Sequence, residues 1–436
     1  MWNYYFVLGM RSLRRNPILT TLMILILALG IGTSMTSLTM LLVLSGDPMP
    51  HKSDRLFVPK FHVADMQGYK AGDDPDFQLT YTDAQNLLND KRGKAQTVLY
   101  SASPTIDAGR KDLPAFSERT MATTADAFAM FDIPFRFGNA WTADADSKAA
   151  NVAVIGPELS EKLFKKENPV GKRLRVDDRD YTITGVLEVW EPTPKFYRLY
   201  GTRATSRPEQ LWIPFSNAVS REYNNSGWNN CSGDGPGPGY AGWLKSECTW
   251  LQYWVELASV GDAVAYKDYL NAYVAEQKKL GRMPRPEPLQ LLNLREWLED
   301  AGVVGRDAQL STWMAFGFLL VCIVNLVALM LAKFTARAGD IGVRRALGAS
   351  RREIFHQYLI EAGVIGLVGA MLGLGLSVYG VHILSSQLAE ASDFYRMDLK
   401  MLTITLAVSM FAALLAGLLP TWRACQVRPA IQLKSQ

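Results

Sequence analysis

The chain has 436 residues, of which 48% are hydrophobic and 20% are charged, and its formal net charge is +4. A chain of this length and composition is too apolar to be disordered and is long enough for two or three domains. The mean hydropathy of +0.00 averages four long apolar runs with one stretch, 45–308, that has the composition of a soluble protein. The sequence therefore predicts an α-helical membrane protein that carries a large soluble domain.

Each of the four apolar runs is long enough to cross a membrane. The first, 18–44, holds no charged residue over 27 positions, which at about 1.5 Å per residue exceeds a hydrocarbon core of roughly 30 Å. A cleaved signal peptide is the alternative, but its apolar region would be only about 7–15 residues long. We expect three further transmembrane helices at 309–332, 354–384 and 401–420. The soluble stretch is then one insertion between the first and second helices.

The charges of the short connecting segments predict the orientation. Segments 1–17, 333–353 and 421–436 hold twelve basic and two acidic residues, a charge of +10, so the rest of this +4 chain carries −6. By the positive-inside rule these segments and both termini are cytoplasmic. The large domain and the short loop 385–400 then lie outside. The twelve basic residues are Arg11, Arg14, Arg15, Lys333, Arg337, Arg344, Arg345, Arg351, Arg352, Arg423, Arg428 and Lys434.

Short β-like and helical patterns alternate in the soluble insertion, which predicts an α+β domain. We expect strands at 55–62 and 151–155, and a helix at 158–166. A hairpin should follow, with strands 172–176 and 181–187 on either side of a four-residue polar turn.

Residues 224–242 are rich in glycine, proline and asparagine, which predicts a long exposed loop without regular structure. Trp228, Trp243 and Trp250 flank this loop. These tryptophans either anchor a partner or pack the loop against its own domain.

Four cysteines fall in three different compartments of the predicted topology. Cys231 and Cys248 lie in the external domain, whereas Cys322 is intramembrane and Cys425 is cytoplasmic. Only the first two could pair, and in an oxidising compartment a bridge between them would stabilise the domain by about 3 kcal/mol through loop entropy. Two free buried thiols are the alternative.

The sequence contains none of the common catalytic or nucleotide-binding motifs. It has no G-x-x-x-x-G-K-[ST], G-x-S-x-G, H-E-x-x-H or C-x-x-C stretch, and its four histidines are dispersed. We therefore expect no catalytic, cofactor or metal site in this chain, and nothing indicates nucleic-acid binding.

Polar and small residues within the apolar runs predict helix packing. Asn325 and Glu361 are polar groups that hydrocarbon would penalise, so we expect them in helix contacts within or between subunits; a substrate site is the alternative. Gly369 and Gly373 form a small-xxx-small pair that permits close backbone approach. Since four helices alone enclose little space, we expect a dimer.

The cytoplasmic segments predict two structural elements. Residues 1–17 combine aromatic and basic residues and suit a helix lying on membrane lipid, with an irregular tail as the alternative. In 333–353, Gly348 can end a short helix, and Ser350 with Glu353 forms a capping box that begins the third transmembrane helix. Such a rigid corner suits the transmission of a push, although a purely topogenic role for its charges is possible.

These features resemble a known family over nearly the whole chain. The stretch 337–354 is similar to the cytoplasmic segment of permeases of the MacB and FtsX type, the type VII ABC transporter superfamily, and Asn325 matches an asparagine of their second transmembrane helix. Residues 151–187 resemble the MacB-type periplasmic core domain. The chain departs from the family in two respects, since Asp340 stands where glutamate is usual and the ATPase domain fused in MacB is absent from this sequence.

The resemblance implies a permease that is not itself an enzyme, in a bacterial inner membrane with its large domain in the periplasm. A separate ABC ATPase subunit would bind ATP and Mg, and its motion would press on the 333–353 loop of a homodimer or of a pair of related permeases. The implied output is efflux with a periplasmic adaptor and an outer-membrane channel. The implied ATPase-coupling residues are Arg337, Asp340, Ile341, Gly342, Arg344, Arg345, Leu347, Gly348 and Arg351.

Three other functions stay open at this point. An FtsX-like permease would transmit force to a periplasmic hydrolase instead of exporting a substrate. A lipoprotein-sorting permease would have the same four-helix plan. A ligand sensor without an ATPase would need an output domain, which the short cytoplasmic segments do not supply.

Overall fold

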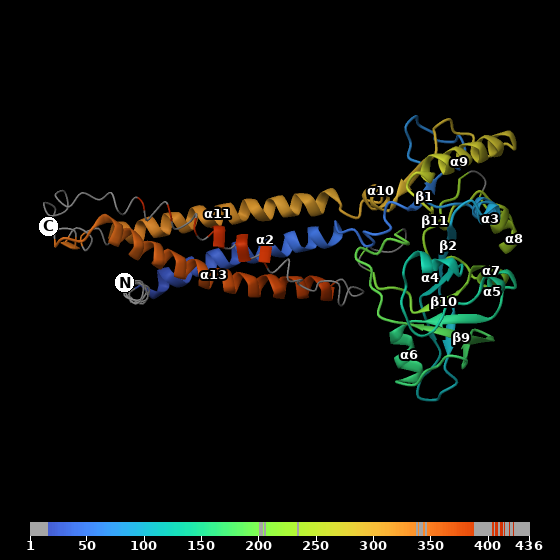
Figure 1. Cartoon of the computed structure of the whole chain (residues 1–436), viewed down its shortest axis with the longest axis horizontal. Coiled ribbons are helices and arrows are strands. Elements are labelled where there is room, and N and C mark those ends of the chain that lie inside the picture. The colour runs from blue at the N-terminus through green and yellow to red at the C-terminus, as the bar shows by residue number, and fades with distance from the viewer. Residues whose placement is uncertain are drawn as a thin grey trace. The chain divides into compact units, whose positions relative to one another are not determined.

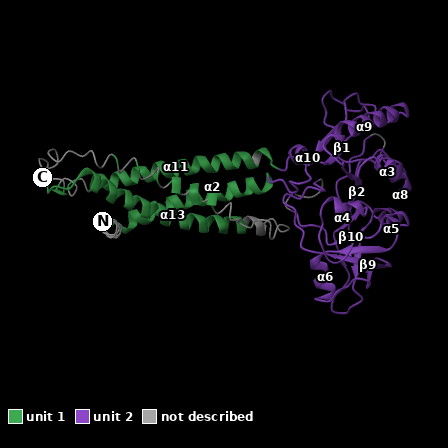
Figure 2. Ribbon diagram, in the orientation of Figure 1, with its two compact units in different colours: residues 1–45, 304–436 green, residues 46–303 purple. Residues whose placement is uncertain are grey.

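The computed structural model describes residues 16–199, 204, 206–232, 235–336, 339, 343–344 and 347–387, together with positions 403, 404, 406–408, 410–412, 414, 418 and 422. The chain divides into two compact units (Figure 2), one formed by residues 1–45 and 304–436 and the other by residues 46–303. Most of the predicted segments 1–17, 385–400, 401–420 and 421–436 lies outside the described residues.

The first unit contains three long apolar helices, α2 (Pro17–Leu44), α11 (Arg306–Ala336) and α13 (Arg351–Gln387). Each is long and apolar enough to cross a membrane, and these three are the candidate spans among the described residues. The first three predicted transmembrane helices are therefore present, while the fourth is described only at scattered positions. Pro17 begins α2, where its fixed φ suits the first helical turn and its missing N–H costs nothing.

α11 continues to Ala336, beyond the predicted end of the second apolar segment at 332. α13 begins at Arg351, as the predicted capping box of Ser350 and Glu353 requires, so both ends of the segment 333–353 are helical. A hydropathy pattern marks where apolar residues stop, not where backbone hydrogen bonding stops. Lys333 stays within α11 because its side chain is buried against α13 instead of reaching solvent.

α2 packs against both α11 and α13 (Figure 1). Met23, Leu27, Ile31 and Met35 follow one another at helical spacing on α2 and are buried in the core of this unit. Periodic burial of this kind identifies α2 as the helix that holds the bundle together.

The second unit is an α+β domain, as predicted, built on a twelve-stranded sheet. Its strands are β1 (Leu56–Lys60), β2 (Ala95–Ala102), β3 (Thr105–Asp107), β4 (Phe116–Ser117), β5 (Thr120–Thr123), β6 (Phe135–Gly138), β7 (Val152–Ile155), β8 (Arg173–Val176), β9 (Arg179–Leu187), β10 (Leu211–Pro214), β11 (Gln252–Glu256) and β12 (Gln290–Asn293). Its helices are α3 (Tyr81–Asp90), α4 (Asp126–Met130), α5 (Ala143–Ser147), α6 (Pro157–Phe164), α7 (Phe215–Ser220), α8 (Gly239–Lys245), α9 (Asp262–Lys279) and α10 (Leu294–Asp300).

The strand order is β12-β1-β11-β2-β5-β10-β7-β9-β8-β3-β4, with β6 paired to β9. Two pairs are parallel, β5 with β10 and β7 with β9, and the other pairs are antiparallel. The first strand of the domain, β1, therefore lies beside its last strand, β12, at one edge of the sheet. This places the beginning and the end of the domain next to each other.

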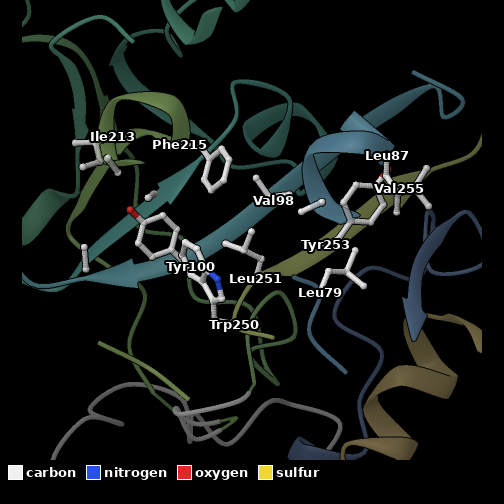
Figure 3. Close-up of a cluster of buried hydrophobic side chains, with 14 of the residues drawn as sticks. Leu79, Leu87, Val98, Tyr100, Ile213, Phe215, Trp250, Leu251, Tyr253 and Val255 are labelled. Atoms are coloured by element: carbon white, nitrogen blue, oxygen red, sulfur yellow. The ribbon is translucent and has the colours of Figure 1, made fainter. Parts of the chain in front are cut away.

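Each face of the sheet carries its own hydrophobic core. On β11, Tyr253 and Val255 point to the core that is shared with α3, α7 and α9, whereas Trp254 points to the core that is shared with α4 and α10, as the period-2 alternation of a strand requires. Figure 3 shows part of the first core, where Tyr100 meets the edge of Trp250 at a centroid distance of 4.9 Å. A sheet covered on both sides gives the domain a rigid frame.

Two predictions within the domain need correction. Val176 pairs with Arg179, so the predicted hairpin turns over two residues and not four, with Asp177 at a positive φ of 49° as tight hairpin turns require. The predicted irregular loop 224–242 ends in a helix, since α8 begins at Gly239. Trp243 on α8 packs against the first core, so tertiary packing overrides the loop-like composition of this segment.

Candidate functional site

The corner between α11 and α13, which the charge pattern predicts to be cytoplasmic, has the geometry that the sequence predicts. The Ser350 N–H donates to Oε2 of Glu353 over 2.9 Å, and the Glu353 N–H donates to Oγ of Ser350 over 3.2 Å. These reciprocal bonds satisfy two amide donors at the start of α13. On the other side of the corner Gly348 has a φ of +102°, which ends the preceding helical turn.

The described part of this corner presents an apolar side chain among arginines. Leu347 is 83% exposed, and Val343 and Arg351 are also exposed. Arg344 donates through Nη1 to Oε1 of Gln357 on α13 over 3.0 Å, which ties the corner to the helix that follows. Burial of this exposed leucine against another surface would remove apolar area from water. Five predicted coupling residues, Arg337, Asp340, Ile341, Gly342 and Arg345, lie outside the described residues.

A buried ion pair joins α11 to α13 behind this corner. Nζ of Lys333 contacts Oε1 of Glu361, and each side chain is 1% exposed. Glu361 was expected in a helix contact, and the structure places it in one. The sequence interpretation missed Lys333 as its partner, although a lysine next to an apolar run and a glutamate within the next run were the available signal.

The predicted small-residue pair lies against α2. A Cβ on Gly369 would lie 2.9 Å from Cδ2 of Leu27, and a Cβ on Gly373 would lie 2.8 Å from Cγ2 of Ile31. Both glycines therefore permit the close approach of α13 and α2.

The side chain of Asn325 is exposed on α11, and it makes no hydrogen bond among the residues that the structure describes. A contact of Asn325 between subunits stays a prediction.

A groove of about 340 Å³ lies between α2 and α13. The hydroxyls of Thr33 and Thr36 donate to backbone carbonyl groups of their own helix, at 2.9 Å to Leu29 and 2.8 Å to Gly32. These hydroxyls are satisfied locally, so the groove presents a mainly apolar lining. Its lining residues are Leu29, Gly32, Thr33, Thr36, Ser37, Leu376 and Gly380.

The two terminal segments of the external domain are fastened together. β1 pairs with β12 from Phe57–Asn293 to Lys60–Gln290. Nζ of Lys60 lies 2.7 Å from Oδ2 of Asp300 on α10, and Nε of Arg295 lies 3.7 Å from Oδ2 of Asp47. Displacement of either terminal segment is therefore carried to the same sheet edge.

The loop that contains the cysteines is well anchored. Cys231 and Cys248 form a disulfide, and next to it Asn230 and Thr249 pair as an isolated β-bridge. The side chain of Asn225 bonds to the Trp228 carbonyl over 2.9 Å and to the Gly227 N–H over 3.0 Å. The loop therefore has a defined conformation.

The three tryptophans beside this loop differ. Trp250 is fully buried, and Trp243 packs on it with a centroid distance of 6.1 Å. Trp228 is 56% exposed. Local packing therefore accounts for two of the tryptophans, and only Trp228 is placed to anchor a partner.

Buried polar residues of the external domain are held by ion pairs and hydrogen bonds. Arg282 binds both Asp83 and Glu247 through its guanidinium group, at 2.8 and 2.6 Å. Burial raises the pKa of Asp146 to about 6, although the Ala125 N–H and the Trp141 ring N–H donate to its carboxylate. The described residues contain no group of three or more side chains that could hold a metal ion.

The sequence matches two family descriptions. "MacB-like periplasmic core domain" covers residues 20–273, more than half of the chain, and "FtsX-like permease C-terminal" covers residues 313–429. The first match includes most of α2 and most of the external domain, and the second includes most of α11 and the chain that follows it.

Individual relatives agree with this assignment. The "Macrolide export ATP-binding/permease protein MacB" of Salmonella paratyphi A is 26% identical over 379 residues, which are 83% of this chain and 50% of that protein. The protein of the same name from Pasteurella multocida is 25% identical over 360 residues, or 79% of this chain and 47% of that protein. The chain therefore spans about half the length of these relatives.

Two solved structures are also similar to the chain. The periplasmic region of MacB from Actinobacillus actinomycetemcomitans has a TM-score of 0.36 and 15% identity, with coverage of 58% of this chain and 94% of that one. The extracellular domain of the noncanonic ABC-type transporter YknZ from Gram-positive bacteria has a TM-score of 0.35 and 13% identity, with coverage of 54% and 100%. The family match over more than half of the sequence shows that the chain belongs to the MacB/FtsX-type family of ABC transporter permeases.

Proposed function

We propose that this permease transmits the motion of an ATPase across the inner membrane to its periplasmic domain. The observation that carries the proposal is the fastening of both terminal segments of that domain to one sheet edge, through the β1–β12 pairing and the Lys60–Asp300 ion pair. A domain that is held in this way responds as a rigid body to movement of the preceding and following helices. The excess of basic residues supports a cytoplasmic location for both termini.

The ATPase is proposed to be a separate subunit that binds ATP and Mg, so that this chain is not an enzyme by itself. Support comes from the names of the relatives, which combine ATP-binding and permease functions. The exposed Leu347 on its rigid, capped corner supports this segment as the docking surface.

A dimer is proposed because Asn325 is exposed on α11. A polar side chain that faces hydrocarbon is costly, and an interhelical hydrogen bond with a second permease subunit would relieve that cost.

The proposed output is efflux with a periplasmic adaptor and an outer-membrane channel, as the name "Macrolide export" of the relatives suggests. Trp228 supports an adaptor contact, since an exposed tryptophan on an anchored loop loses little conformational entropy when a partner buries it.

Lipoprotein sorting is the second candidate, and the groove between α2 and α13 favours it. A volume of about 340 Å³ with satisfied hydroxyls suits an acyl chain better than a polar substrate. Under the FtsX-like alternative, the protein that is retained on the periplasmic domain would be a hydrolase instead of an adaptor.

The experiment is affinity purification of the tagged full-length chain from its native membranes, followed by mass spectrometry and an ATPase assay. The proposal predicts retention of a P-loop ATPase by the wild type and its loss in Leu347→Asp. Leu280→Asp is the matched control, because Leu280 is an exposed leucine of the external domain. If Leu347→Asp retains as much ATPase as the wild type, the corner is not part of the docking surface. If no ATPase is retained by the wild type even after cross-linking, the proposal is contradicted.

A further inference from the structure

The Lys333–Glu361 pair lies at the end of the bundle that is nearest to the corner. Lys333 is three residues before the end of α11, and Glu361 is ten residues after the start of α13. The exposed Trp313 on α11 and Tyr379 on α13 suit the opposite membrane interface. Along each helix the pair is about 27–30 Å from these aromatic residues, at about 1.5 Å per residue. It is therefore at the edge of the hydrocarbon core, close to the corner.

Buried side chains connect the pair to the corner. The rings of Phe334 and Tyr358 have a centroid distance of 4.3 Å, and both are buried. Ile354, one turn earlier on α13, belongs to the same core and directly follows the capping-box residue Glu353. α11 and α13 each pack mainly on α2, and the Phe334–Tyr358 contact and the ion pair join the two helices directly at this end of the bundle.

Stability alone does not account for two buried charges at this position. Well-packed apolar side chains of similar volume are often as stabilising as a buried ion pair, because taking two charges out of water is costly. Apolar contacts, however, tolerate sliding of one helix along the other, because an apolar side chain that loses one apolar neighbour can pack against the next one. Sliding by one turn, about 5.4 Å, would separate a lysine from a carboxylate in a medium of low dielectric constant. The pair therefore fixes the register of the two helices.

We propose that Lys333 and Glu361 are positioning residues that lock α11 and α13 in register, so that both helices move as one lever when the corner is pushed. This inference rests on the proposed force-transmitting function and adds the residues that make the hairpin rigid. Without the pair, the ends of α11 and α13 next to the corner would lose their direct charged contact, and part of the push would be lost before it reached the periplasmic domain.

The test uses the full chain reconstituted with its ATPase in liposomes. Two quantities are measured, the ATPase rate and the change in hydrogen exchange of segments 46–60 and 290–303 on addition of ATP and vanadate. The central variant is the double substitution Lys333→Met, Glu361→Leu, which replaces the charges by apolar groups. We expect this variant to keep at least half of the wild-type ATPase rate. Its ATP-dependent change in hydrogen exchange should be about fivefold or more smaller than that of the wild type.

Three further variants make the test specific. The charge swap Lys333→Glu, Glu361→Lys should restore at least half of the response, because it restores an ion pair. The double substitution Asp144→Leu, Lys148→Met removes an exposed ion pair and should leave the response unchanged. Glu361→Asp keeps the charge but shortens the side chain, so it should lose more than half of the response. If the central variant does not insert into membranes, Glu361→Asp tests the role of the ion pair in its place.

The outcomes separate this inference from the function on which it rests. If wild type shows no ATP-dependent change in exchange, the force-transmitting function itself fails. If wild type responds and the central variant, or Glu361→Asp in its place, responds equally, the locking role of the pair is overturned while the function stands.

Discussion

Lys60 on β1 and Asp300 at the end of α10 form an ion pair of 2.7 Å that joins the first and last segments of the periplasmic domain. The lysine side chain is almost fully buried, whereas the carboxylate is partly exposed. Because α2 precedes one segment and α11 follows the other, this contact is where movements of the two helices would be combined.

Substitution of Lys60 by methionine should weaken this junction. Removing one partner of a partly buried pair leaves an uncompensated carboxylate, so we expect the domain to lose about 2 kcal/mol of unfolding free energy. Urea-dependent proteolysis of the full chain in detergent measures the loss. Lys148→Met, which removes a lysine from a pair with Asp144 in which both side chains are exposed, should change the unfolding free energy by less than about 1 kcal/mol. Equal effects of the two variants would contradict a special role for Lys60.

Removal of the disulfide should destabilise the periplasmic domain. The double substitution Cys231→Ser, Cys248→Ser restores the freedom of an 18-residue loop in the unfolded chain, worth about 3 kcal/mol in the loop-entropy model. Urea unfolding with and without reductant measures this, since reductant should lower the midpoint for the wild type only. A wild-type midpoint that does not respond to reductant would show that the bridge does not constrain the domain.

Arg282 should be one of the most sensitive positions of the domain. Its guanidinium group binds the fully buried Asp83 and also Glu247, so Arg282→Ala leaves a buried carboxylate without its main counter-charge. We expect a loss of about 3–5 kcal/mol. Arg173→Ala, which removes an exposed arginine 3.6 Å from Asp180, should cost less than about 1 kcal/mol. A small effect at Arg282, measured by the same unfolding assay, would contradict this interpretation of the cluster.

Asp146 should make the stability of the domain depend on pH. Burial raises its pKa in the folded state to about 6, above a typical unfolded value of about 3.9. The protonated form of Asp146 is therefore favoured in the folded state. Its contribution to the free energy of unfolding is fully present below about pH 4 and is lost as the pH rises through 6. Allowing for partial solvent screening, we expect a decrease of about 2 kcal/mol between pH 4 and pH 7.

Asp146→Asn provides the comparison for this pH effect. The amide does not titrate, so the difference in unfolding free energy between wild type and variant should shift by this amount between pH 4 and pH 7. A difference that stays constant across this range would show that Asp146 does not titrate differently on folding.

Asn325 should contribute to dimerisation. Asn325→Leu removes the interhelical hydrogen bond proposed for it, and typical values of about 0.6–1.7 kcal/mol predict a three- to twentyfold weaker dimer in lipid bicelles, measured by energy transfer between labelled chains. Val324→Leu, at the neighbouring exposed position, should leave the affinity nearly unchanged. An unchanged affinity in Asn325→Leu would place this residue outside the interface.

Local signals in the sequence predicted the local structure correctly. Ser350 and Glu353 cap α13 as predicted, because a reciprocal side-chain bond acts within a few residues. Composition also predicted the α+β domain. Family resemblance predicted the permease class, which the family match over more than half of the chain confirms.

Features that depend on distant residues could not be predicted in the same way. The pairing of β1 with β12 joins residues more than two hundred positions apart, and no local pattern encodes it. The burial of Lys333 depends on Glu361, so hydropathy placed this lysine in a loop although it lies within a helix. α8 forms where the composition predicts a loop, because Trp243 gains contacts with the core that composition does not report.

The most direct test of the account is hydrogen exchange of the wild-type chain reconstituted with its ATPase, compared with and without ATP and vanadate. Transmission of force predicts that exchange changes in segments 46–60 and 290–303, where the terminal segments of the periplasmic domain meet. Suppose that the ATPase hydrolyses ATP in the absence of vanadate but exchange stays unchanged in both segments when ATP and vanadate are added. That result would contradict the claim that this permease carries the motion of the ATPase to its periplasmic domain.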